Sequence, residues 1–195
     1  MSNSIFRSDR KFNLICLIIG QLLFCLTTFY WLDDGRYSID AGTIMFFSML
    51  FWAIGFMGLF GLLKESIPIY SKLGLLYAMY GIFGGVAFAL EGIFEEALAS
   101  GDQIGVNAAE LFPLQMNLVM FQSGPAFPLS FLVLGMVLAA RKKVSWLAGI
   151  LLSLGGVTFP LGRIIRMETV AHLTDLVLLV AVFLITFEIW NKGDE

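Results

Sequence analysis

Several ionisable side chains lie at the ends of apolar segments that are predicted to be helices. These residues are the ones best suited to bind an ion or to move a proton. A charge placed within the apolar zone of a membrane costs roughly 2.5–3.5 kcal/mol even on the mildest scale, so such residues are kept for function or paired for stability. The candidate site residues are Glu91, Glu95, Arg163, Arg166, His172 and Asp175.

Helical spacing places these residues on common faces, because positions three or four apart lie on one side of a helix. If the faces converge, an outward-facing polar pocket for a small solute or ion results, with Glu91 or Glu95 expected to contact Arg163 or Arg166. The alternative is that the charges lie at headgroup level, solvated or paired for stability. The three sets are Glu91 with Glu95, Arg163 with Arg166, and Glu168 with His172 and Asp175.

His172 is the single histidine of the sequence. Histidine exchanges protons near neutral pH, so beside Asp175 and Glu168 it is a candidate proton-sensitive switch. Only carboxylates accompany it, whereas zinc sites are rich in histidine and cysteine, so no metal site is expected. The two cysteines, Cys16 and Cys25, belong to no metal or redox motif and are expected to be small apolar fillers.

An intramembrane enzyme is a less favoured alternative. Glu95 and Glu96 resemble the start of the Glu-Glu-x-x-x-Arg motif of CAAX-type membrane proteases, but Ser100 stands at the arginine position. That family needs two further histidine motifs, which a chain with one histidine cannot supply. No nucleophile motif or phosphate-binding loop is present, so no catalytic residue and no cofactor is predicted.

The composition indicates the elements that must position these residues. The chain has 195 residues, of which 58% are hydrophobic and 14% charged, against roughly 45–50% and 25% in soluble domains. This predicts an all-α membrane protein, a six-transmembrane-helix bundle forming a single domain over 1–195, with the lipid bilayer as its surroundings. The net charge of −3 gives no basic excess for nucleic-acid binding.

Six apolar segments approach the roughly 20 residues that cross a hydrocarbon core. The first is too long for a signal peptide and lacks a cleavage pattern, so it is expected to remain as a span. Proline favours a first helical turn, so Pro125 should open the fourth span and leave a separate outer-side helix at about 112–122. The predicted spans are about 12–32, 43–63, 73–93, 125–140, 144–162 and 171–190.

The positive charges predict the orientation, because cytoplasmic loops retain Lys and Arg. With both termini in the cytoplasm, nine of the twelve basic residues lie inside, and Arg36, Arg163 and Arg166 lie outside. The sequence therefore predicts a multi-pass protein of the cell membrane with cytoplasmic N- and C-termini. The candidate site then lies on the outer side.

An internal similarity links the third and fifth segments. Residues 84–93 and 155–164 are identical at six of ten aligned positions, beginning with Gly84-Gly85 and Gly155-Gly156. Both segments run outward, so spans 2-3 and 4-5 could be a parallel duplication of a helical hairpin. Glycine-rich spans also resemble each other for packing reasons alone.

Two functions remain open from the sequence. The favoured hypothesis is binding or transport of a small solute or ion through the outward-facing pocket. The alternative is a non-catalytic scaffold or accessory subunit with a membrane protein partner.

Overall fold

The computed structural model describes residues 2–98 and 103–192. Across these residues the regular secondary structure is helical, apart from an isolated bridge between Trp31 and Tyr37, and six helices are long and apolar enough to cross a membrane. The predicted all-α six-helix bundle is confirmed, and the chain is built as a multi-pass membrane protein. The six are α1 (Ser2–Thr28), α2 (Ile39–Gly61), α3 (Pro68–Ala97), a continuous segment over Pro113–Ala140 that ends in α6 (Ser123–Ala140), α7 (Trp146–Ile164) and α8 (Glu168–Asn191).

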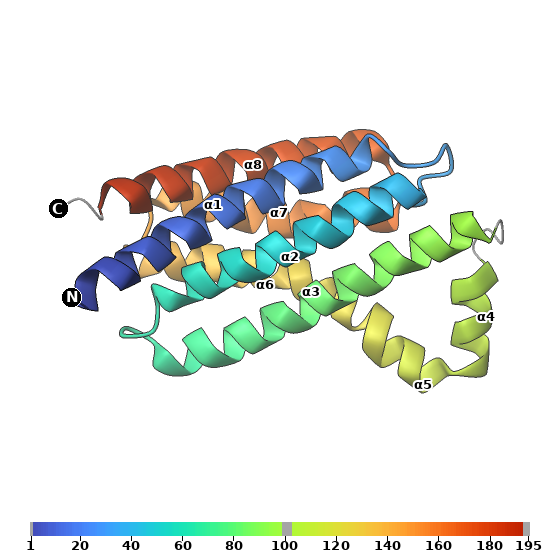
Figure 1. The fold of residues 1–195 in the computed structure, drawn as a ribbon, viewed down its shortest axis with the longest axis horizontal. Helices are drawn as coiled ribbons and strands as arrows, with labels where there is room; N and C mark the ends of the chain where they lie inside the picture. The colour runs from blue at the N-terminus through green and yellow to red at the C-terminus, as the bar shows by residue number, and fades with distance from the viewer. Residues whose placement is uncertain (1, 99–102, 193–195) are drawn as a thin grey trace.

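The long helices pack as a closed ring in the order α1, α2, α3, α6, α7, α8, with α8 returning to α1 (Figure 1). α3 and α8 therefore lie on opposite sides of the ring. Both ends of the chain lie at one end of the bundle, which we call the N/C end. The opposite end, which we call the loop end, carries the 29–38 loop and the turn between α7 and α8.

Local sequence signals fix where several helices begin. Ser38 and Ser145 cap α2 and α7, and their hydroxyls accept hydrogen bonds from the N–H groups of Ala41 and Ala148. Such caps satisfy N–H groups that lack a partner in the first helical turn. Pro68 occupies the first turn of α3, where its missing N–H is no loss.

The helices α6 and α7 end in the same way. Lys142 and Arg166 adopt the left-handed conformation, with φ of 55° and 56°. In each case the following N–H reaches back to the last helical turn, from Lys143 to the Leu138 carbonyl and from Met167 to the Gly162 carbonyl. These bonds are those of a Schellman cap, which usually places glycine at the left-handed position.

A broken helical segment precedes α6. It comprises α4 (Gln103–Leu111), α5 (Pro113–Met116) and a π-helical turn, η1 (Asn117–Phe121). The region predicted as a separate helix at about 112–122 is thus α5 with η1, and it leads directly into α6. The short α4, which lies across the loop end, was not anticipated (Figure 1).

Aromatic rings fill the centre of the bundle. Phe24 of α1, Trp52 of α2 and Phe131 of α6 are fully buried, and Phe127 lies between them. Ring centroids are 4.8 Å apart for Trp52 and Phe131 and 6.0 Å apart for Phe24 and Phe127. This cluster ties α1 and α2 to α6 across the ring, and Phe159 extends it to α7.

The two glycine pairs of the internal similarity occupy equivalent places. A Cβ on Gly84 would meet the next helix in the ring, α6, and one on Gly85 would meet the preceding helix, α2. A Cβ on Gly155 would likewise meet the next helix, α8, and one on Gly156 the preceding helix, α6, all at 2.2–2.6 Å. The equivalence supports the duplication, which stays a prediction.

Candidate functional site

A buried ion pair joins α7 to α8 in the loop-end half of the bundle. Nη2 of Arg163 lies 3.1 Å from Oδ1 and 3.2 Å from Oδ2 of Asp175. The two side chains are only 7% and 2% exposed. Asp175 is two turns into α8, about 10 Å along the axis from its first residue, so the pair lies within the span rather than at its edge.

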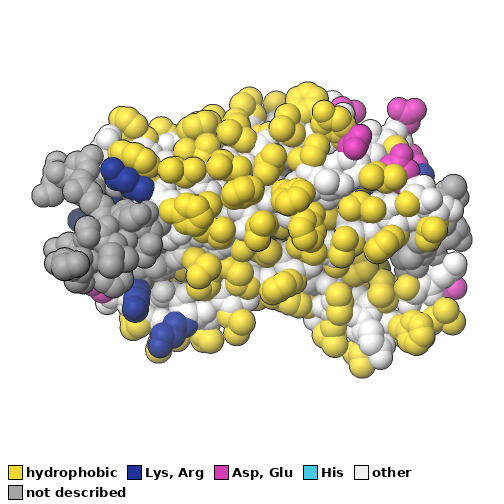
Figure 2. All heavy atoms as spheres, viewed as in Figure 1, with side chains coloured by type: hydrophobic (Ala, Val, Ile, Leu, Met, Phe, Trp, Pro, Cys, Tyr) yellow, Lys and Arg dark blue, Asp and Glu magenta, His cyan; other side chains and the backbone are white. Residues whose placement is uncertain are grey.

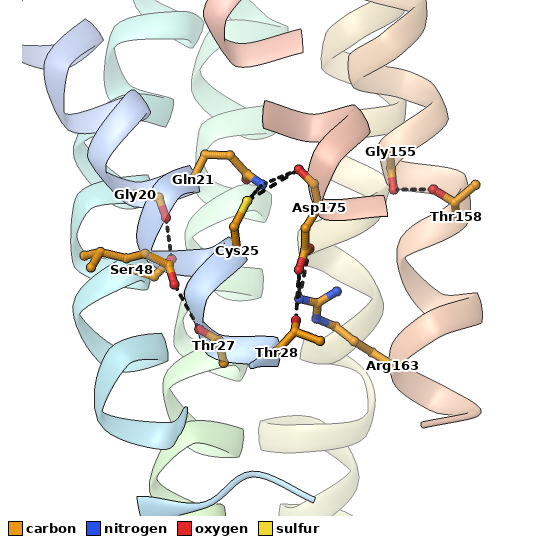
Figure 3. A network of polar contacts seen from close by, with 11 residues as sticks. Gly20, Gln21, Cys25, Thr27, Thr28, Ser48, Gly155, Thr158, Arg163 and Asp175 are labelled. Carbon is orange, nitrogen blue, oxygen red and sulfur yellow. Dashed lines mark hydrogen bonds and ion pairs between the residues drawn. The ribbon is translucent and has the colours of Figure 1, made fainter. Parts of the chain in front are cut away.

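Helix α1 holds Asp175 through three polar side chains (Figure 3). Thr28 donates its hydroxyl to Oδ2 of the carboxylate at 2.9 Å. Gln21 donates its amide to the Asp175 carbonyl at 3.0 Å, and the Cys25 thiol contacts the same carbonyl at 3.6 Å. Three helices therefore meet at one residue, and Cys25 is part of a polar network rather than the apolar filler that was expected.

Aromatic rings surround the guanidinium of Arg163. Its Cζ lies 4.3 Å from the ring centroid of Phe24, 4.4 Å from that of Phe159 and 5.8 Å from that of Trp31. Cations are attracted to aromatic faces within about 6 Å, and the attraction grows when water is excluded. The rings thus stabilise the charge while shielding it from the bilayer.

The 29–38 loop covers the pair at the loop end. Trp31 and Tyr37 pair through their backbones, and their rings pack edge to face with centroids 5.8 Å apart. Burial raises the pKa of the Tyr37 hydroxyl, and Arg163 opposes this shift through its charge and through the contact of its side chain with the hydroxyl. Gly35 turns the loop with φ of +77°, and a Cβ there would lie 2.7 Å from the Cβ of Arg166. The cover is therefore fitted closely against the α7–α8 turn.

Four buried polar atoms around the pair have no hydrogen-bond partner among the described residues. They are Nε and Nη1 of Arg163, Nε1 of Trp31 and Oε1 of Gln21. Buried polar groups are nearly always paired, and each exception calls for a physical explanation. Three of the four atoms are donors, so the site can offer hydrogen bonds to acceptor groups while Asp175 balances the charge.

His172 lies at the edge of this site. Its Nε2 is 3.4 Å from Oε1 of Glu168, and its ring packs on Phe29 with centroids 4.3 Å apart. The Glu168 side chain is 64% exposed, so this pair faces outward, one helical turn before Asp175. His172 thus lies beside the buried pair, but its ring nitrogen faces Glu168 rather than the pair.

The acidic residues of α3 flank the cover from the other side. Glu95 is buried and Glu91 is partly buried, and both make polar or electrostatic interactions. A Cβ on Gly92, between them, would meet Tyr37 of the loop at 2.6 Å. The cover therefore lies between these residues and Arg166, and the predicted contact of Glu91 or Glu95 with an arginine stays a prediction.

Arg163 and Asp175 were predicted from the sequence as site residues, whereas the residues that α1 contributes were not. A signal existed, because Gln21, Cys25 and Thr28 follow the same i, i+4, i+7 spacing used for α8. The rings of Phe24, Phe159 and Trp31 carried no comparable signal, since aromatic residues occur in every span. The described residues include no cluster of histidine, cysteine and carboxylate side chains that could hold a metal ion.

Comparisons with protein-family models, with curated proteins and with solved structures find no match for this chain. Any functional conclusion therefore rests on the site.

Proposed function

We propose that the protein binds a small polar solute or ion at the Arg163–Asp175 site, within the loop-end half of the membrane. The observation that carries this proposal is the set of unpaired polar atoms around one buried ion pair. Each unsatisfied buried polar group costs about 1–3 kcal/mol. A ligand that accepts hydrogen bonds from Arg163 and Trp31 recovers part of this free energy, which is the source of its affinity.

The pair also suits a site that must remain stable between binding events. Asp175 neutralises Arg163, so the pair adds no net charge to the site. The Phe24 and Phe159 rings exclude water, which strengthens electrostatic interactions inside the site. The donors are therefore already positioned for a ligand, so binding costs little side-chain entropy.

The charge distribution indicates which way the site faces. Basic side chains gather at the N/C end and acidic side chains at the loop end (Figure 2). With basic ends retained in the cytoplasm, the termini lie inside and the 29–38 loop outside. In this orientation, in the cell membrane, the loop is the cover through which a solute reaches the site from the outer side.

A scaffold or accessory-subunit role is the second candidate, and one observation favours it. The Asp175 carboxylate is well satisfied by Arg163 and Thr28, as expected for a pair that only fixes helices for a partner. A scaffold role, however, does not explain why the donors of Arg163 and Trp31 are buried without partners. The two candidates are separated by whether small solutes change the environment of these donors.

NMR of the protein in nanodiscs tests the proposal. The indole N–H signal of Trp31, assigned with Trp31→Phe, and the Nε–H signal of Arg163, assigned with Arg163→Lys, are followed during titration with sodium chloride, sodium acetate, glycine and glycerol. Saturable shifts of both signals with one of these solutes are expected. Trp146, which is exposed at the N/C end, supplies the control indole. Signals that none of the four solutes moves, or that move only together with Trp146, contradict the proposal.

A further inference from the structure

A groove runs along the outer face of α3, on the far side of the ring from α8. It has a volume of about 580 Å³. Its length from the first to the last lining residue is about 15 Å, half of a hydrocarbon core of roughly 30 Å. The groove is therefore as long as the apolar part of one membrane leaflet. Its lining residues are Leu73, Leu76, Tyr77, Met79, Tyr80 and Phe83.

The groove is open to the bilayer along most of its length. Leu73, Leu76 and Phe83 are 62%, 68% and 70% exposed, although all three are large and apolar. Towards the loop end, the Tyr80 hydroxyl donates a hydrogen bond to the Leu118 carbonyl of η1. The lower outline of the molecule is hollowed between the start of α3 and the α4–α5 segment (Figure 2). An apolar chain entering from the N/C end thus fits the groove up to about mid-membrane.

Positive charges lie where the groove reaches the membrane surface. Lys72 precedes Leu76 by one turn and so shares its helical face, and Lys64 lies in the turn before α3. Both lysines are exposed, and no carboxylate among the described residues pairs with either amine. Glu65 is the one acidic residue in the turn at 62–67. The surface end of the groove therefore carries a net positive charge.

We infer that this groove retains an anionic phospholipid, with one acyl chain along α3 and its phosphate against Lys64 and Lys72. The lipid belongs to the leaflet at the N/C end. Basic residues at this level of the membrane attract anionic headgroups. The apolar groove adds van der Waals contact with the acyl chain, which holds this lipid longer than the other lipids of the bilayer. The inference is independent of the Arg163 site, which lies between α1, α7 and α8.

Native mass spectrometry tests the inference on protein released from vesicles of equimolar phosphatidylglycerol and phosphatidylcholine. The unmodified chain should retain phosphatidylglycerol in preference, and Lys72→Gln should lower that preference about fivefold, as should Lys64→Gln. Lys192→Gln is the matched control, because Lys192 is an exposed lysine at the same end of the bundle but follows the last residue of α8. It should leave the preference unchanged.

A second variant addresses the apolar part of the groove. Leu76→Trp places a bulky ring in the groove at an exposed position, so folding should be preserved while retention of either lipid falls. Equal retention of the two lipids by the unmodified chain overturns the inference. So does a loss of preference in Lys192→Gln as large as that in Lys72→Gln, or undiminished retention by Leu76→Trp.

Discussion

Arg163 contacts Asp175 through a single guanidinium nitrogen, Nη2, which lies 3.1 and 3.2 Å from the two carboxylate oxygens. Arginine usually binds a carboxylate with two nitrogens as a fork, and here the remaining nitrogens, Nε and Nη1, are buried without a partner. The pair therefore uses only part of what Arg163 can offer.

Thr28 should contribute to stability through its bond to Asp175, and Thr27 supplies a matched control. Both threonines are buried on α1, but the Thr27 hydroxyl donates to the Leu23 carbonyl of its own helix. Thr28→Val removes a hydrogen bond to a charged group and should lower the free energy of unfolding by about 2 kcal/mol. Thr27→Val should lower it by well under 1 kcal/mol, as measured by unfolding in detergent. Equal losses would contradict the assignment.

The Arg163–Asp175 pair should show strong coupling in a double-mutant cycle. Arg163→Met or Asp175→Leu alone leaves a buried charge without its partner and should cost about 3–5 kcal/mol of stability. The double variant leaves no charge, so it should recover much of that loss. Thermal unfolding of the four proteins measures the coupling, and losses that simply add would exclude a direct pair.

Tyr37 should make the cover sensitive to alkaline pH. Its pKa is raised in the folded chain because burial disfavours the phenolate. The folded state therefore binds this proton more tightly than the unfolded state, so its contribution is complete below the ordinary tyrosine pKa of about 10 and is lost as pH rises above it. Fluorescence of the neighbouring Trp31 should report loosening of the loop above pH 10. Tyr37→Phe should abolish this step, and its persistence in that variant would assign it elsewhere.

Lys142 should be replaceable by glycine with a gain in stability. Its φ of 55° lies in the left-handed region, which costs a side-chain-bearing residue roughly 1–2 kcal/mol. Glycine fits this position of the Schellman cap without that cost, so Lys142→Gly should raise the free energy of unfolding by about 0.5–1 kcal/mol. Lys143→Gly, one residue later, is the control and should give no gain. Destabilisation by Lys142→Gly would show that the lysine side chain has another role.

Much of the architecture could be predicted because it depends on chain-wide physical signals. Hydropathy alone identifies the six spans, since each must match the thickness of the bilayer core. The end of α6 was harder to predict from the sequence than its interior, because Lys142 stands where glycine is usual. The π-helical turn at 117–121 and the short α4 were not predicted, since both depend on packing against α3 rather than on periodicity.

The candidate site was predicted only in part because one sequence does not determine helix rotation. Charge and spacing selected Arg163 and Asp175, but their pairing with each other requires knowing which faces of α7 and α8 meet. Thr28 of α1 joins the site although it is separated from Asp175 by 147 positions in the sequence. Trp31 joins it only because the loop folds back over the bundle. Such contacts arise from the tertiary fold and leave little trace in local sequence.

If the Arg163 site can be reached from the loop end, Cys25 beside it should be open to chemical labelling from that side. Cys16→Ala leaves Cys25, 3.6 Å from the Asp175 carbonyl, as the sole thiol of the chain. A small membrane-impermeant methanethiosulfonate should modify it from the loop side of sealed vesicles. Cys25→Ala, which retains only the buried Cys16, is the control and should not react.

Gly35→Ala should accelerate this labelling of Cys25 about tenfold, because a Cβ at φ of +77° and 2.7 Å from Arg166 strains the cover by about 1–2 kcal/mol. Labelling from the loop side alone, and faster in Gly35→Ala, is expected. A Cys25 thiol that stays unreactive in both proteins, or that reacts only from the N/C side, would contradict it.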